Sequence, residues 1–366
     1  MTFLSFAMPV SMLGVIWPDV RGHFSQTLGT LGLVSLVYGV SRMLTCASGR
    51  RLIGLFGTGP AFVAALGLLA LSCSVLATAP NWRTFLAGVA GIGMTSGMLD
   101  SIGAVFITRL GDVESAGLVH GSYGVGATLG PLVVAVMPTW RVALFVCSAV
   151  TVAAGALAYR TRNHWPPDEE RHERAMSPEP IDRRAVLLSI GLFVCLVGIE
   201  VATGQWAHTY LTDHRRVSDR LAALGVAGFW GGITIGRLAL SRPVVMAAVD
   251  RLGLATLAAL AAALLAAMVI TPPLIATGVL VGVGVALSPI IPTLFATTSR
   301  RVGLVHAQRL AGWQLLAANT GAITAPSLTG WLVDRIGPGT IAIVWFAVIA
   351  AGTPLLVADR RLVAKV

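Results

Sequence analysis

The sequence has 366 residues, of which 55% are hydrophobic and 11% are charged, and its mean hydropathy is +0.81. Soluble globular chains carry about 25% charged residues, so this composition excludes a soluble protein and indicates an integral membrane protein. The net charge is +10, and Lys365 is the only lysine. The basic residues lie in short turns between apolar runs, which predicts contact with anionic lipid at the cytoplasmic side and argues against a nucleic-acid partner.

About twelve apolar runs follow one another, most of them near the ~20 residues that a helix needs to span a bilayer. The first begins at the N-terminus without the basic start and small-residue cleavage site of a signal peptide, so we interpret it as a transmembrane helix. We therefore predict an all-α membrane protein. The runs are Thr2–Trp17, Leu28–Ala47, Pro60–Thr78, Thr84–Thr108, Ser115–Met137, Trp140–Tyr159, Ala185–Leu211, Leu221–Leu240, Leu252–Ile270, Leu274–Thr298, Leu304–Val333 and Gly339–Val357.

A polar, proline-containing stretch over residues 160–184 separates the first six runs from the last six. We interpret it as a cytoplasmic linker between two six-helix halves, residues 1–159 and 185–366. Basic residues at the helix ends on the linker side outnumber those on the opposite side by more than two to one. The positive-inside rule then places both termini in the cytoplasm.

The two halves share residues at one offset. Arg42 and Arg237 are 195 residues apart (237 − 42), and each follows a glycine-containing turn of the second run of its half. The Gly-Ala pairs at 126–127 and 321–322 and the prolines Pro131 and Pro326 repeat at the same offset. Parallel repeats of this kind are typical of transporters, in which the substrate site lies between the halves near the bilayer midplane.

Only two of the 16 acidic residues, Asp100 and Glu200, are predicted to lie deep within the spans. A charged side chain at the centre of a membrane helix costs at least ~2.5 kcal/mol unless it faces a cavity or a partner. Asp100 shares a helix face with small residues, and we leave two interpretations open: a substrate or proton site, or a structural partner of Arg42 or Arg237. For the two arginines we favour structural pairing.

Glu200 lies midway along the seventh run and has no cation on its own helix, which favours a functional role. With the 195-residue offset, Ser5 is expected opposite Glu200 and Pro9 opposite Gly204. Further along the run, Gln205 could bond a hydroxylated ligand and Trp206 could stack on a polar ring or anchor the helix at the interface.

Several other polar residues of the spans are candidate ligands. His120 and Tyr123 open the fifth run, and Gln314 and Asn319 lie in the corresponding eleventh run. Each could contact a substrate or join helices together. In the tenth run, Pro289 and Pro292 predict a kink in the helix.

Two segments carry a shared motif: Asp250-Arg251-Leu252-Gly253, and Gly330 to Gly337 with Asp334-Arg335. The twelve spans, the duplicated halves and this motif resemble the major facilitator superfamily, whose signature reads G-x-L-x-D-R-x-G. The resemblance implies gating or structural roles for Arg42, Arg237, Asp250, Arg251, Asp334 and Arg335. The first-half copy departs from the pattern, because no acid occurs between Gly39 and Gly59.

Three segments, residues 120–131, 198–211 and 312–326, look like the fucose-permease-like sugar transporters. That branch ties an acid on the fourth span to substrate or proton handling, and Asp100 occupies a similar place. The branch also carries an acid on the first span, whereas this sequence has none before Asp19.

We therefore expect a transporter of the cytoplasmic membrane that moves a small polar, sugar-like solute by alternating access. Proton symport is the expected coupling, with no cofactor other than the proton gradient, no bound metal and a monomer as the working unit. Alternatives are a proton-driven exporter of hydrophobic compounds and a membrane receptor or scaffold without transport. No nucleophile–base set stands in the spans, so an enzyme is not expected. Glu200 and Asp100 are the first candidates for substrate or proton binding, followed by Gln205, Trp206, Gln314, Asn319, His120 and Tyr123.

Overall fold

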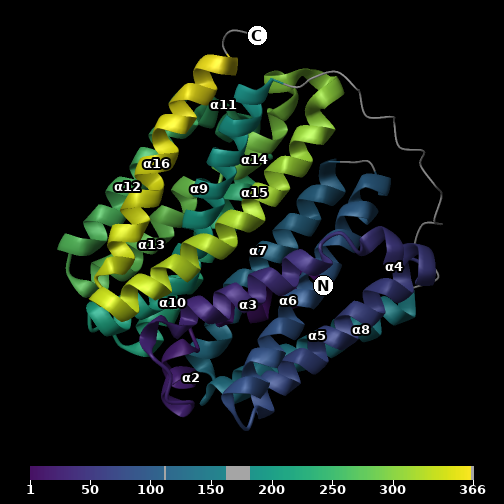
Figure 1. Ribbon diagram of the computed structural model, residues 1–366, viewed down its shortest axis with the longest axis vertical. Coiled ribbons are helices and arrows are strands. Elements are labelled where there is room, and N and C mark those ends of the chain that lie inside the picture. Colours follow the sequence, from purple (N-terminus) through teal and green to yellow (C-terminus); the bar gives the residue numbers. More distant parts are fainter. Residues whose placement is uncertain (111–112, 162–181, 364–366) are drawn as a thin grey trace. The chain divides into compact units, whose positions relative to one another are not determined.

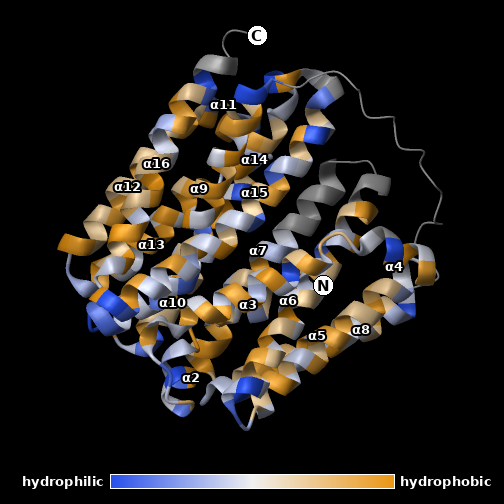
Figure 2. Cartoon of the chain, viewed as in Figure 1, coloured by the Kyte–Doolittle hydropathy of each residue, from blue (hydrophilic) through white to orange (hydrophobic). Residues whose placement is uncertain are grey.

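The computed structural model describes residues 1–110, 113–161 and 182–363, and this part of the chain is helical without strands (Figure 1). Apolar residues cover the helices along most of their length, and hydrophilic residues gather at helix ends (Figure 2). The helices are α1 (Thr2–Met12), α2 (Trp17–His23), α3 (Leu31–Thr45), α4 (Gly49–Phe56), α5 (Thr58–Thr78), α6 (Trp82–Leu110), α7 (Val113–Val136), α8 (Trp140–Thr161), α9 (Arg183–Thr209), α10 (Asp219–Ala239), α11 (Pro243–Leu252), α12 (Leu254–Ile270), α13 (Pro273–Leu287), α14 (Ile290–Ala296), α15 (Thr298–Ile336) and α16 (Thr340–Val363), with a 3₁₀ turn η1 (Leu28–Thr30) and a π-helical turn η3 (Tyr210–His214).

Within the described residues, eight helical stretches are long and apolar enough to cross a membrane, and the number rises to ten if two bent pairs each count as one span. The pairs are α1 with α2, bent by 58°, and α11 with α12, bent by 83°. The remaining predicted runs lie in α7, whose apolar part is the shorter helix Gly121–Val136, and in α15. The prediction of an all-α membrane protein is confirmed.

The first and tenth predicted runs are both interrupted. The prediction of a single helix over Thr2–Trp17 was wrong, because α1 ends at Met12 and α2 begins at Trp17 with Pro18 in its first turn. Proline favours the start of a helix because it lacks the N–H that an interior position would need. The kink predicted for the tenth run is confirmed, since α13 ends at Leu287 and Pro289 precedes α14.

The chain forms two compact units. The first comprises Met1–Arg171 and Asp219–Ala227, and the second comprises His172–Ser218 and Gly228–Val366. In the first unit α1 packs on α7, α3 on α6, and α5 on both α6 and α8. In the second, α9 packs on α15 and α16, and α12 packs on α13 and α16. The predicted linker 160–184 lies mainly outside the described residues.

In each unit, a glycine with positive φ directly precedes the third span. Gly57, with φ of 81°, follows the short helix α4, and Gly253, with φ of 79°, follows α11. Side chains disfavour this left-handed region, so glycine is needed at both positions. The shared conformation shows that the two units repeat the same backbone turn between their second and third spans.

Two arginines at helix ends, one in each unit, have a structural role. Arg141 donates to the carbonyl oxygens of Ala77 and Ala79, at the C-terminal end of α5. Arg215 donates to the carbonyl oxygens of Met268, Val269 and Thr271, at the end of α12. Because the last carbonyls of a helix lack intrahelical partners, these guanidinium groups cap the third span of each unit.

Close helix contacts show how the repeat is aligned. A Cβ at Gly126 on α7 would overlap the carbonyl oxygen of Leu4, and one at Gly321 on α15 would overlap that of Val194. The two glycines are 195 residues apart (321 − 126), but their partners are 190 apart (194 − 4). A second pair of contacts gives the same two offsets: Gly130 with Met8, and Ala325 with Gly198.

The first span of each half therefore follows an offset of 190, not 195. The prediction that Ser5 corresponds to Glu200 and Pro9 to Gly204 was wrong. The contacts place Val10 opposite Glu200 and Gly14 opposite Gly204. The ungapped comparison failed because the connection between the first and second spans differs in length by five residues.

The glycine contacts predict opposite effects for two substitutions on the same helix. Gly321→Ala should lower the free energy of unfolding by about 1–3 kcal/mol, because the new methyl group meets the backbone of α9. Gly312→Ala, where nothing lies within 4 Å of the added Cβ, should raise stability by up to ~1 kcal/mol through better helix propensity. Thermal unfolding of the purified variants measures both. Equal melting temperatures would contradict the close approach of α9 and α15.

Candidate functional site

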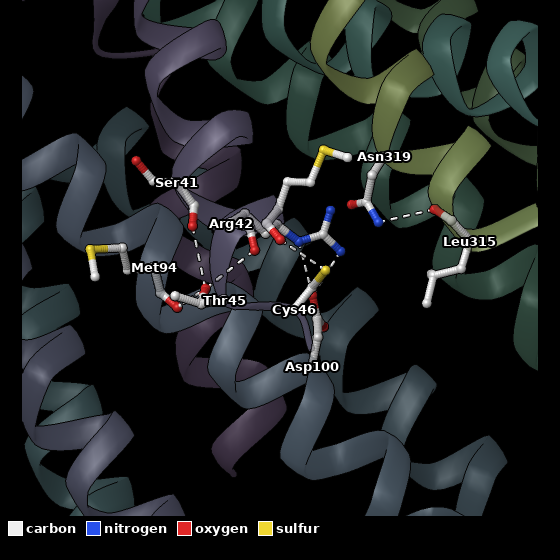
Figure 3. A network of polar contacts seen from close by, with 9 residues as sticks. Ser41, Arg42, Thr45, Cys46, Met94, Asp100, Leu315 and Asn319 are labelled. Atoms are coloured by element: carbon white, nitrogen blue, oxygen red, sulfur yellow. Dashed lines mark hydrogen bonds and ion pairs between the residues drawn. The ribbon is translucent and has the colours of Figure 1, made fainter. Parts of the chain in front are cut away.

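The first unit contains an ion pair between α3 and α6 (Figure 3). Arg42 donates from Nε and Nη2 to Oδ2 of Asp100, at 2.9 and 2.7 Å. The helices can approach because a Cβ at Gly97 would overlap the Arg42 carbonyl, and Thr45 bonds the Met94 carbonyl at 2.7 Å. The side chains of Arg42 and Asp100 are 27% and 31% exposed, so the pair is partly accessible.

The second unit contains an ion pair between α9 and α10. Nη2 of Arg237 donates to both carboxylate oxygens of Glu200, at 3.0 and 2.7 Å. The Glu200 side chain is 12% exposed and that of Arg237 is 28% exposed. Within the described residues, Nε of Arg237 is buried and has no hydrogen-bond partner. The Nε–H of the guanidinium thus remains as a donor that the contact with the acid does not use.

The two pairs share the arginine position but not the acid position. Arg42 and Arg237 are 195 residues apart, on the second span of each half. Asp100 lies on the fourth span of its half, and its counterpart in the other half, at the offset of 195, is Phe295. Glu200 lies on the first span of its half, and the helix contacts make Val10 its counterpart in the other half. Each half therefore supplies its own carboxylate, and the partner of Asp100, left open by the sequence, is Arg42.

Two tryptophans near Glu200 have different environments. Trp206 on α9 is fully buried, and its indole N–H donates to the carbonyl oxygen of Pro326 at 3.0 Å. This bond gives the indole N–H a partner within the protein, and the predicted stacking role stays a prediction. Trp230 on α10 lies against Gly204, where a Cβ would overlap the indole ring.

The other candidate ligands are dispersed over both units. Gln314 is fully buried and its side-chain oxygen accepts from Thr298. Asn319 donates to the Leu315 carbonyl at 3.0 Å, one turn earlier on α15 (Figure 3). These contacts give both amides a structural partner. Three more candidates complete the set: Gln205 is 7% exposed, Tyr123 packs on Phe6 with ring centroids 5.3 Å apart, and the His120 side chain lies outside the described residues.

Sequence analysis missed one buried ion pair. Arg301 donates from Nε and Nη2 to the two carboxylate oxygens of Asp359 on α16, and the side chains are 2% and 8% exposed. The same guanidinium donates to the Leu294 carbonyl and to Thr297 Oγ1. Both residues lie just beyond the ends of predicted runs, where a charge is usually solvated. Nearby, α15 bends at Gly303, with φ of 75°; the sequence itself gives no signal that the two residues pair.

The motif residues lie at the surface of their helices. Asp250 and Arg251 are exposed near the C-terminus of α11, one turn before the Gly253 bend. Arg335 lies over the Trp331 ring, with 4.2 Å between its guanidinium carbon and the ring centroid. Asp334, next to it, is exposed at the end of α15. The gating role implied for these residues stays a prediction.

Comparisons with known proteins agree with this architecture. The chain is 29% identical over 304 residues to the glucose/galactose transporter of Brucella abortus, which covers 75% of this chain and 72% of that protein. It is 26% identical over 272 residues to bypass of stop codon protein 6 of Saccharomyces cerevisiae, covering 65% of this chain and 54% of that protein.

Solved structures share the fold at 14% sequence identity. The nucleoside transporter NupG matches with a TM-score of 0.77 over 99% of this chain and 97% of that one. A bacterial homologue of the human lysosomal transporter Spinster matches with a TM-score of 0.69 over 99% and 91%. Residues 1–326 match the profile of the Major Facilitator Superfamily. The chain therefore belongs to the major facilitator superfamily and is a multi-pass membrane transporter, not an enzyme.

Proposed function

We propose that the protein is a secondary active transporter that moves a sugar-like solute by alternating access, in symport with protons. The observation that carries the proposal is the Glu200–Arg237 pair, a partly accessible carboxylate and guanidinium on facing spans. The sequence similarity to a glucose/galactose transporter supports a hexose as the solute.

The chemistry of the pair suits coupling. A guanidinium offers five donors in a planar fork, and a carboxylate that gains a proton loses the charge that holds this fork. Protonation of Glu200 would therefore release donors of Arg237 to the hydroxyl oxygens of a solute. Asp100 and Arg42 provide the same chemistry in the first half. The amides Gln205, Gln314 and Asn319 are proposed second-rank ligands, because they can exchange hydrogen bonds with hydroxyl groups.

We further propose that the protein works as a monomer in the cytoplasmic membrane, with both termini and residues 160–184 in the cytoplasm. The excess of arginine at helix ends on that side supports the orientation. Cysteine labelling of the two termini in intact cells tests it, because labelling by an impermeant reagent would reverse the assignment.

Carboxyl-to-amide substitutions test the coupling. In proteoliposomes, an inward proton gradient should drive concentrative uptake of D-galactose or D-glucose by the wild type. Glu200→Gln and Asp100→Asn should each reduce gradient-driven uptake at least tenfold, because an amide cannot exchange the proton. Asp182→Asn is the matched control, since asparagine replaces aspartate as an N-cap with little loss.

The outcomes separate the parts of the proposal. Normal coupled uptake by both amide variants would refute the assignment of these acids. Solute efflux driven by the gradient would instead identify an exporter. Hexose binding without flux in the wild type would indicate a receptor.

A further inference from the structure

One face of α10 carries a second polar group besides Arg237. Trp230 lies seven residues before Arg237, which is about two helical turns, so both side chains leave the helix on the same side. The Trp230 ring packs on Gly204, one turn after Glu200 on α9. Any side chain at position 204 would displace the ring, so this glycine fixes where the indole lies.

The indole N–H of Trp230 lacks an acceptor. Trp230 is 8% exposed, and its Nε1 is buried without a hydrogen-bond partner in the described part of the chain. Buried indoles usually find an acceptor, as Trp17 does at the Leu28 carbonyl and Trp206 at that of Pro326. Trp345 also lacks one but packs against Tyr210, the first residue of η3.

The first half repeats the pattern. Ser35 on α3 is 195 residues before Trp230 (230 − 35) and seven residues before Arg42. It is 7% exposed, and its hydroxyl is likewise buried without a partner among the described residues. By contrast, Thr45 on α3 and Thr234 on α10 each donate to a carbonyl three or four residues earlier. An unpaired donor thus precedes the arginine by two turns in both halves.

The offset of 195 holds for these helices on independent contacts. In the first unit a Cβ at Gly93 would meet Ser41, and in the second a Cβ at Gly236 would overlap Ser288. Gly93 corresponds to Ser288 and Ser41 corresponds to Gly236, each pair 195 apart. In the first unit the serine is on the second span and the glycine on the fourth, whereas in the second unit the two residue types are reversed. The contact between α3 and α6 is nevertheless repeated between α10 and the end of α13. Ser35 and Trp230 therefore occupy equivalent positions.

We propose that Trp230 is a solute-binding residue, and that Ser35 is its counterpart in the first half. The indole N–H donates to a hydroxyl oxygen of the transported solute, and Arg237 binds a second oxygen along the same helix face. The inference rests on the proposed function, because a polyhydroxylated solute supplies an acceptor for each of the two donors. It adds a recognition residue that distinguishes one hydroxyl of the solute from the others.

Trp230→Phe tests the proposal because phenylalanine keeps an aromatic ring but removes the N–H. In proteoliposomes, KM for D-galactose should rise about tenfold, which corresponds to one hydrogen bond of ~1.4 kcal/mol, with little change in maximal rate. The melting temperature of the solute-free protein should fall less than in Trp206→Phe, because both variants lose buried ring atoms but only Trp206→Phe also loses a protein hydrogen bond. Trp206→Phe is the matched control: it removes the bond to Pro326 and should lower the melting temperature.

Monodeoxy-galactoses then locate the contact. One of the monodeoxy-galactoses should be taken up by the wild type about tenfold more weakly than galactose, as expected for one lost hydrogen bond. The Trp230→Phe variant should take up this analogue and galactose equally. An unchanged KM in Trp230→Phe, or a melting temperature lowered as in Trp206→Phe, would overturn the inference and leave the proposed function intact. Absence of hexose uptake by the wild type would overturn the proposed function, and the inference with it.

Discussion

Asp359→Asn is expected to destabilise the protein by about 3–5 kcal/mol, the range for a buried ion pair that loses one partner. Asp359 supplies both carboxylate oxygens to Arg301, and both side chains are almost fully buried. An amide offers one acceptor and no charge, so the guanidinium would remain buried and uncompensated. The same arginine holds the end of α14 through Leu294 and Thr297, so α14, α15 and α16 should loosen together.

Thermal unfolding of the purified protein in detergent measures this loss. Asp250→Asn is the control, because it makes the same chemical change at an exposed position. The double variant Arg301→Met with Asp359→Leu should recover part of the stability, since apolar residues can replace a buried ion pair at little cost. If the Asp359→Asn variant had the same melting temperature as the wild type, the pair would not be buried as described.

Arg237→Gln is expected to abolish transport, with a loss of a hundredfold or more. The substitution removes the donor that holds both oxygens of Glu200 and leaves a carboxylate that is 12% exposed without its cation. A hydrogen bond to a charged group contributes ~1.5–3 kcal/mol, so the single variant should also unfold at lower temperature. Uptake in proteoliposomes and thermal unfolding give the two readouts.

The double variant Glu200→Gln with Arg237→Gln separates structure from transport. It removes both charges and should regain most of the lost stability. Proton-driven uptake should remain absent, because neither amide exchanges a proton. Recovery of coupled uptake in the double variant would show that the pair only holds α9 and α10 together.

Much of the fold follows from the sequence because membrane helices are encoded by local hydropathy. The twelve apolar runs correspond to helices or bent helix pairs, and Pro289 correctly predicts an interruption. The break after Met12 was missed, because the run remains apolar through Trp17 and hydropathy does not report backbone direction. Helix pairing was predictable only where glycines repeat, as at Gly126 and Gly321.

The candidate site was predicted less completely, because ion pairs join residues distant in sequence. The cost of a charge in a membrane singled out Asp100 and Glu200, but not which arginine each one binds. Asp359 escaped notice because it lies near a helix end, where a charge is usually solvated. Trp230 was overlooked for the opposite reason: an indole in an apolar span resembles an ordinary core residue until its N–H is found without an acceptor.

The change of offset from 195 to 190 locates an insertion or deletion in the history of the duplicated gene. The second spans keep 195, so the five-residue difference arose between Gly14 and Ser35, or between the corresponding Gly204 and Trp230. In the second half this connection includes the five-residue π-helical turn Tyr210–His214. A chimaera that exchanges the first spans of the two halves must therefore have its junction before this connection, so that each second span keeps the connection of its own length.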